Sequence, residues 1–222
     1  MWRPTCHCES KVNDSCLVNG VTAALIWRAS DTRTHQTTCV PPVEPIVVSR
    51  ARTLAADVLR DDPEVHEHSV RAARRAAVVA HRIPSSRAAD VVAAAWLHDI
   101  GHAAALRRTG FHPLDGALFL MSEDWPERIV RLVAHHSLAS LEAPFYGVGH
   151  HLSVIEVVTG VDADILISAD MCAGLGNSAP TVDARLEAMR LADAEVGLVP
   201  EEVRQARYDG LRAAHDRVEA LL

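Results

Sequence analysis

From Ile46 onward, apolar residues recur at the three- and four-residue spacing of amphipathic helices, and strand-like alternation is almost absent. Hydrophobic residues make up 49% of the chain and aromatic residues only 4%, so the apolar faces consist mainly of aliphatic side chains. Prolines stand near several proposed helix starts, where a missing N–H does no harm. The pattern predicts an all-α domain with helices over residues 46–60, 64–82, 85–100, 113–123, 126–137, 152–158, 163–173, 181–195 and 200–221.

The 222 residues suit one domain and an extension. Residues 1–45 show no sustained period and end in a proline-rich linker, so we predict an N-terminal extension with the composition of a loosely ordered tail, followed by a folded domain over 46–222. The five cysteines are odd in number and unevenly spaced, which does not describe a disulfide framework. A reduced tail is the simpler interpretation, and a zinc site is the alternative, with the candidate ligands Cys6, His7, Cys8, Cys16 and Cys39.

The formal net charge of −7 argues against nucleic acid as a partner, because a phosphate backbone requires a basic face. The longest apolar run, residues 91–97, is far shorter than the roughly 20 residues that span a bilayer, so no membrane partner is expected. Residues 17–27 follow an acidic start and not a basic one, which does not fit a signal peptide. We therefore expect a cytoplasmic protein.

A histidine and an aspartate stand side by side in the run Leu97-His98-Asp99-Ile100-Gly101-His102, where an apolar helix is predicted to end. Neighbours on a regular helix point about 100° apart and could not share one ion. Gly101 could adopt the left-handed backbone that ends a helix, which would allow both side chains to reach one cavity. His68, near the start of an upstream helix, and Asp170, at the end of a downstream one, complete a plausible metal site.

The ordered set of His68, His98-Asp99 and Asp170 resembles the signature H…HD…D of the HD-domain metal-dependent phosphohydrolases, over about residues 46–195. This resemblance implies an HD-domain helical bundle in which these four residues hold a divalent transition metal ion. Imidazole and carboxylate ligands suit Mn, Fe, Co, Ni or Zn better than Mg, which prefers an all-oxygen shell.

His112 and one or both of His135 and His136 match a second set of histidines that some HD proteins use to hold a second ion. Two ions could share Asp99 and a hydroxide that attacks phosphorus. With one ion, His112 would begin a helix and the histidine doublet would only end one, so both arrangements stay open.

Asp99, His102 and Asp170 are the candidate catalytic residues. His102 stands where many HD proteins have a lysine, and it could supply a positive charge or a proton to the leaving group, or could simply cap a helix. Asp170 could orient the attacking water as well as bind metal. Arg71 and Arg75 share a helix face and could meet a phosphate, although an ion pair between Arg71 and Glu67 is favoured.

The resemblance implies a metal-dependent phosphohydrolase that acts on a small phosphoester or a nucleotide through a metal-activated hydroxide. Two alternatives remain: a diiron oxygenase of the same superfamily, and a non-catalytic HD signalling domain, because a fold does not fix a function. The sequence leaves homo-oligomerisation open. His150 and His151 form another doublet, which we place in a glycine-rich surface loop.

Overall fold

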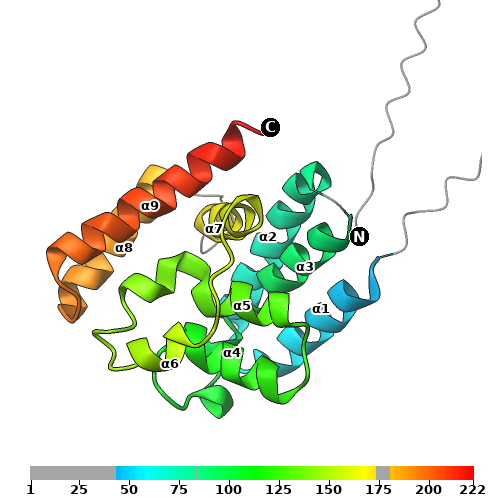
Figure 1. Ribbon diagram of the computed structural model, residues 1–222, viewed down its shortest axis with the longest axis horizontal. Helices are drawn as coiled ribbons and strands as arrows, with labels where there is room; N and C mark the ends of the chain where they lie inside the picture. The colour runs from blue at the N-terminus through cyan, green and yellow to red at the C-terminus, as the bar shows by residue number, and fades with distance from the viewer. Residues whose placement is uncertain (1–43, 84, 174–180) are drawn as a thin grey trace, which may run out of the picture. The chain divides into compact units, whose positions relative to one another are not determined.

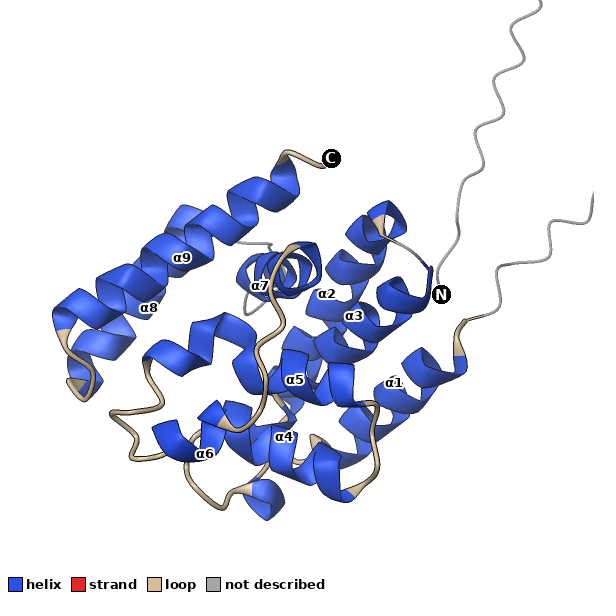
Figure 2. Cartoon of the chain, in the orientation of Figure 1, coloured by secondary structure: helices blue, strands red, loops and turns tan. Residues whose placement is uncertain are grey.

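The computed structural model describes residues 44–83, 85–173 and 181–222, and these ranges contain helices and turns but no β-strand (Figure 2). The predicted all-α fold is confirmed for this part of the chain. Its α-helices are α1 (Ile46–Val58), α2 (Pro63–Val79), α3 (Ser85–Leu97), α4 (His112–Ser122), α5 (Glu127–His135), α6 (Gly149–Ser153), α7 (Val161–Ala173), α8 (Val182–Val196) and α9 (Glu201–Glu219) (Figure 1). Short 3₁₀ helices are η1 (Ala80–Arg82), η2 (Ile100–His102), η3 (Ala104–Leu106) and η4 (His136–Leu141).

The helix predicted over residues 152–158 is wrong. The chain forms a five-residue helix, α6, which carries His150 and His151, and then runs irregularly to Gly160, which has a φ of +85°. The segment after α6 is rich in β-branched residues, which lose side-chain freedom in a helix. The histidine doublet therefore lies on a short helix and not in a loop.

Small buried side chains bring the first three helices close together. α2 begins at Pro63, and the carboxylate of Asp62 accepts a hydrogen bond from the backbone N–H of Val65 at 3.4 Å. Alanines make up much of the buried surface of α2 and α3, and they are fully or nearly fully buried: Ala72, Ala73, Ala76, Ala93, Ala94 and Ala95. Close backbone approach across these faces leaves little free volume where α2 and α3 carry the candidate ligands.

Helix α7 lies between α2 and α3 on one side and the α8–α9 pair on the other (Figure 1). Ile165 and Ala169 belong to the main core, whereas Ile167 and Met171 pack with Leu186 and other side chains of α8 and α9. Because α7 is buried on both faces, its near-continuous apolar sequence is explained. Any polar side chain in its interior, including Asp170, must find partners inside the protein.

The buried carboxylate of Asp162 fixes the start of α7. Arg87 from α3 donates to both of its oxygens, at 3.0 and 2.8 Å, and Arg128 from α5 pairs with the same carboxylate. The Asp162 side chain is fully buried, while both arginines keep part of their surface in water. Hydrogen bonds of this charged kind are roughly twice as strong as neutral ones.

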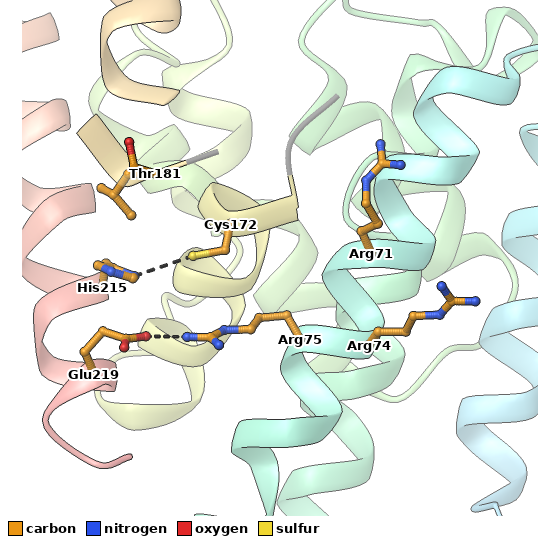
Figure 3. A pocket seen from close by; sticks show the side chains of 8 residues that line it. Arg71, Arg74, Arg75, Cys172, Thr181, His215 and Glu219 are labelled. Carbon is orange, nitrogen blue, oxygen red and sulfur yellow. Dashed lines mark hydrogen bonds and ion pairs between the residues drawn. The ribbon is translucent and has the colours of Figure 1, made fainter. Parts of the chain in front are cut away.

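Helix α9 packs along α7 and also contacts α2 through an ion pair between Arg75 and Glu219 (Figure 3). No helix in the described ranges is both long and apolar enough to cross a membrane. The candidate zinc ligands Cys6, His7, Cys8, Cys16 and Cys39 lie outside the described residues. Cys172, on α7, is a free thiol.

We expect Asp162→Ala to lower the free energy of unfolding by about 1.5–3 kcal/mol, because two guanidinium groups lose a shared acceptor. Urea unfolding followed by circular dichroism measures this change. Glu187→Ala removes an exposed ion pair with Arg190 and is the control, with an expected change within about 0.5 kcal/mol. Equal effects of the two substitutions would contradict the role assigned to Asp162.

Candidate metal centre

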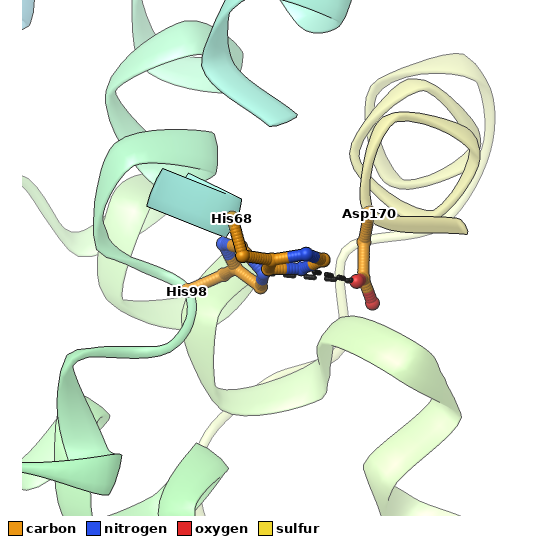
Figure 4. A group of neighbouring side chains, drawn as sticks. All are labelled: His68, His98 and Asp170. Carbon is orange, nitrogen blue, oxygen red and sulfur yellow. Dashed lines mark hydrogen bonds and ion pairs between the residues drawn. The ribbon is translucent and has the colours of Figure 1, made fainter. Parts of the chain in front are cut away.

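Three chain segments bring the four candidate ligands together. His68 lies in the second turn of α2, His98 and Asp99 directly follow α3, and Asp170 lies in the last turn of α7. Figure 4 shows His68 and His98 with their rings directed at the Asp170 carboxylate. The structure thus gathers the four residues that the H…HD…D pattern singled out.

The first group of ligands consists of His68, His98 and Asp170, whose donor atoms all lie within 4.8 Å of one another. His68 Nε2 is 2.9 Å from Asp170 Oδ1, and His98 Nε2 is 3.8 Å from the same oxygen. All three side chains are almost completely buried. Two imidazoles and a carboxylate are a typical donor set for a divalent transition metal ion.

The second group consists of Asp99, His112 and His136, again with donor atoms within 4.8 Å of one another. His112 is the first residue of α4, and His136 follows α5 as the first residue of η4. Each Nε2 lies 3.5 Å from Asp99 Oδ1, and the two Nε2 atoms are 3.1 Å apart.

Asp99 lies between the two groups and presents one oxygen to each. Its Oδ2 is 3.3 Å from His98 Nε2 and 3.6 Å from His68 Nε2, whereas its Oδ1 faces His112 and His136. A carboxylate placed in this way can bridge two ions about 3.5–4 Å apart. The geometry therefore offers two adjacent sites, with four and three ligands, that share Asp99.

The tautomers of two histidines are set for ligation. His98 Nδ1 lies 3.0 Å from the Ala95 carbonyl, and His136 Nδ1 lies 2.7 Å from the Val133 carbonyl. Because a carbonyl oxygen only accepts, each Nδ1 carries the proton and each Nε2 is directed into the site. His98 Nε2 is buried and has no hydrogen-bond partner among the described residues. A metal ion bound to this nitrogen would supply the missing partner.

The electrostatics of the site favour a positive charge between the carboxylates. Burial alone would raise the pKa of Asp99 and of Asp170, but the surrounding imidazoles outweigh it and hold both well below their usual range. Burial lowers the pKa of His98, yet Asp99 and Asp170 together raise that pKa well above its ordinary value. Burial lowers the pKa of His112, so this ring is neutral.

His135 is not brought to the site. Its Nε2 lies 2.8 Å from the Ile155 carbonyl, and it belongs to neither ligand group. Consecutive residues at the end of a helix point in different directions, so only His136 of the doublet faces Asp99. The structure thus gives His135 a contact with the segment after α6.

His102 lies at the exposed edge of the cluster. Its ring stacks on His112 with centroids 3.9 Å apart, and its Nε2 is 3.9 Å from Asp99 Oδ1. Its side chain is 41% exposed, so it faces the solvent from which a substrate would arrive. Burial lowers the pKa of His102, which makes a neutral ring, and not a permanent positive charge, its state at pH 7.

Gly101 acts through its size and not through a left-handed backbone, which corrects the expectation from the sequence. The described glycines with positive φ do not include it. A Cβ built on Gly101 would lie 2.0 Å from the carbonyl oxygen of His112 and 2.7 Å from the backbone nitrogen of Gly116. The absent side chain lets the start of α4 lie directly against η2, which places His112 beside Asp99.

A turn that the sequence did not indicate holds Asp170. Ser137 and Leu138 both have left-handed backbones, with φ of 53° and 58°. This conformation costs roughly 1–2 kcal/mol per residue for side chains other than glycine. It directs Ser137 Oγ to donate to Asp170 Oδ2 at 2.6 Å, which leaves Asp170 Oδ1 facing His68.

Helix α9 stabilises this turn from outside. Arg207 Nε donates to the Ser137 carbonyl at 3.0 Å, and the same guanidinium bonds Glu142 at 2.9 Å. Leu138 packs directly over Gly210, where a Cβ would lie 2.5 Å from the leucine Cδ1. These contacts offset the backbone strain. No short motif marks Ser137, Arg207 or Gly210 in the sequence.

The two arginines considered as phosphate contacts, Arg71 and Arg75, already have partners within the protein. Arg71 forms the favoured ion pair with Glu67, with the guanidinium nitrogen 2.7 Å from the carboxylate oxygen, and its Nε donates to the Ala173 carbonyl at 2.6 Å. Arg75 pairs with Glu219. Arg71 is therefore held one turn beyond His68, against the end of α7.

We expect Gly101→Ala to destabilise the chain by about 1–3 kcal/mol, because backbone atoms of α4 block the new methyl group. Moving α4 also displaces His112, so the metal content per chain should fall. Thermal unfolding and elemental analysis measure the two effects. Ala104→Ser, an exposed change in the next turn, is the control and should alter neither; a Gly101→Ala protein that behaves like this control would contradict the assignment.

Comparison with known proteins supports the metal centre described above. No curated protein and no solved structure matches the chain at a significant level. The family model described as HD domain matches residues 65–194, more than half of the chain, and this range contains every residue of both ligand groups. The chain therefore belongs to the HD domain family.

Proposed function

We propose that this protein hydrolyses a phosphoester or phosphoanhydride bond of a small molecule, such as a nucleotide, with two divalent metal ions. The placement of Asp99 carries this proposal, because its two oxygens face two separate groups of ligands. Membership in the HD family, most of whose members are hydrolases, supports it. A site for one structural ion would not need a second set of histidines around the other oxygen.

His68, His98 and Asp170 would hold one ion, His112 and His136 the other, and Asp99 would bridge them. Mn, Fe, Co, Ni and Zn all suit these donors. Such ions, when bound, supply a nucleophilic hydroxide and polarise the phosphorus under attack. This activity is what the shared carboxylate and the two groups of ligands support best.

The protein's own residues prepare the site for a phosphorylated substrate. Asp99 and Asp170 are ionised, since their pKa values lie well below the usual range, and they balance part of the charge of the ions. His102 and His112 form the accessible side of the cluster, so a substrate would approach across their stacked rings. His102 Nε2 is then placed to take up or release a proton near the leaving group.

The diiron oxygenase alternative uses the same kinds of ligand, and metal analysis separates it from hydrolysis. Two irons per chain, O₂-dependent turnover and no phosphate release would favour oxygen chemistry. Metal-dependent release of phosphate, without a requirement for O₂, would favour the proposal. A chain that takes up no metal when it is supplied would support the non-catalytic alternative.

We expect Asp99→Ala to reduce bound metal and to lower phosphate release by about 100-fold or more, because both ions lose their shared ligand. Helicity should be retained, since Asp99 follows α3 and is not part of its apolar face. Elemental analysis, circular dichroism and assays with generic phosphomonoesters and phosphodiesters measure these properties. His150→Ala removes an exposed histidine of α6 and is the matched control. Undiminished turnover by metal-free Asp99→Ala protein would refute the mechanism.

Ser137→Ala should weaken metal binding by about 10–100-fold, because Asp170 loses the hydrogen bond that orients its carboxylate. Ser137→Thr keeps a hydroxyl and should recover part of the affinity. The d–d absorption spectrum of the Co²⁺-loaded protein reports the ligand geometry directly. Ser153→Ala, which removes an exposed hydroxyl of α6, is the control. An unchanged cobalt spectrum and affinity in Ser137→Ala would show that Ser137 does not position Asp170.

A further inference from the structure

A second hollow, separate from the metal centre, lies between α2, α7 and α9 (Figure 3). Its volume is about 520 Å³, which is large enough for a small organic anion. None of the residues of the two ligand groups lines it. The lining residues are Arg71, Arg74, Arg75, Cys172, Thr181, Val182, His215 and Glu219.

The lining of this hollow is basic although the chain is acidic. Three arginines and a single carboxylate, Glu219, line it, in a chain of formal net charge −7. Arg74 is exposed and forms no ion pair within the described part of the chain. A local excess of positive charge in a concave surface attracts anions and concentrates them there.

Arg75 shows how an anion would be held. Its guanidinium reaches across the hollow to Glu219 on α9, as Figure 3 shows. Its Nε is buried and has no acceptor among the described residues. Glu219 thus occupies part of an anion site but leaves one buried donor unsatisfied, and a phosphate has enough oxygens to satisfy it.

The first residues of α8 add to this environment. Thr181 caps the helix by accepting the Ala184 N–H at 3.2 Å, and α8 continues for 15 residues from Val182. The start of a helix carries partial positive charge, which favours an anion beside it. His215 of α9 also lines the hollow, and its Nδ1 lies 3.0 Å from Ser168 Oγ.

We propose that this hollow is a second binding site, which takes the phosphate groups of a small anionic ligand and is distinct from the metal centre. Arg75 supplies the main charge, and Glu219 is an internal competitor that the ligand displaces. The site shares α2 and α7 with the metal centre, since Arg71 lies one turn after His68 and Cys172 two residues after Asp170. The proposal does not depend on hydrolysis.

Isothermal titration calorimetry with inorganic pyrophosphate tests the proposal. The full-length Asp99→Ala chain is used so that the metal centre does not contribute, and the unsubstituted chain is titrated in EDTA as a second route. Both should bind pyrophosphate. Arg75→Met should weaken binding about 10-fold or more, because the central charged donor is lost. Arg60→Met, an exposed arginine just after α1 that does not line the hollow, is the control and should leave the affinity unchanged.

Glu219→Gln separates ligand binding from a purely structural ion pair. Both Arg75→Met and Glu219→Gln break the Arg75–Glu219 pair, so a structural role predicts that both weaken binding. The proposal predicts the opposite for Glu219→Gln, about threefold tighter binding or more, because the competing carboxylate is removed. No binding by either starting protein, or equal affinities in all variants, would overturn the proposal. Failure of the proposed hydrolase would instead appear as unchanged turnover in Asp99→Ala.

Discussion

The burial of the Asp99 and Asp170 carboxylates is the constraint on which the rest of the structure depends. Two ionised carboxylates inside a protein are strongly unfavourable unless positive charge and hydrogen bonds surround them. Here imidazoles from α2, α4, η4 and the residue that follows α3 surround them, and the pKa of His98 is raised as a result. The helices must therefore end, begin or turn at the cluster, which explains why α3 ends at Leu97 and α4 begins at His112.

Much of the fold could be predicted because the helices follow apolar periodicity, which is local. The start of α1 at Ile46 and the long helices α2, α7 and α9 agree with the sequence within a few residues. The errors fall where tertiary contacts decide the conformation. The helix that was predicted to run to 137 ends at His135, because Ser137 and Leu138 adopt left-handed backbones that only contacts with α9 make favourable.

The site shows the same division between local pattern and tertiary contact. His68, His98, Asp99 and Asp170 could be identified because their order and spacing resemble a known signature. The choice between His135 and His136 could not, since one residue along a helix end changes the direction of a ring by about 100°. Only the turn that follows, and the carbonyls of Val133 and Ile155 that accept the ring protons, settle which ring faces Asp99.

Helix α9 supports the metal centre from outside the range that matches the family model. The HD match ends at residue 194, before α9 begins at Glu201, and all ligand candidates precede it. Yet Arg207 bonds the turn that orients Asp170, and Gly210 leaves the space into which Leu138 packs. A shift of α9 would therefore displace the strained turn at Ser137 and Leu138, and with it the hydrogen bond that orients Asp170. Since Glu219 on the same helix also faces Arg75, the metal centre and the basic hollow share one structural support.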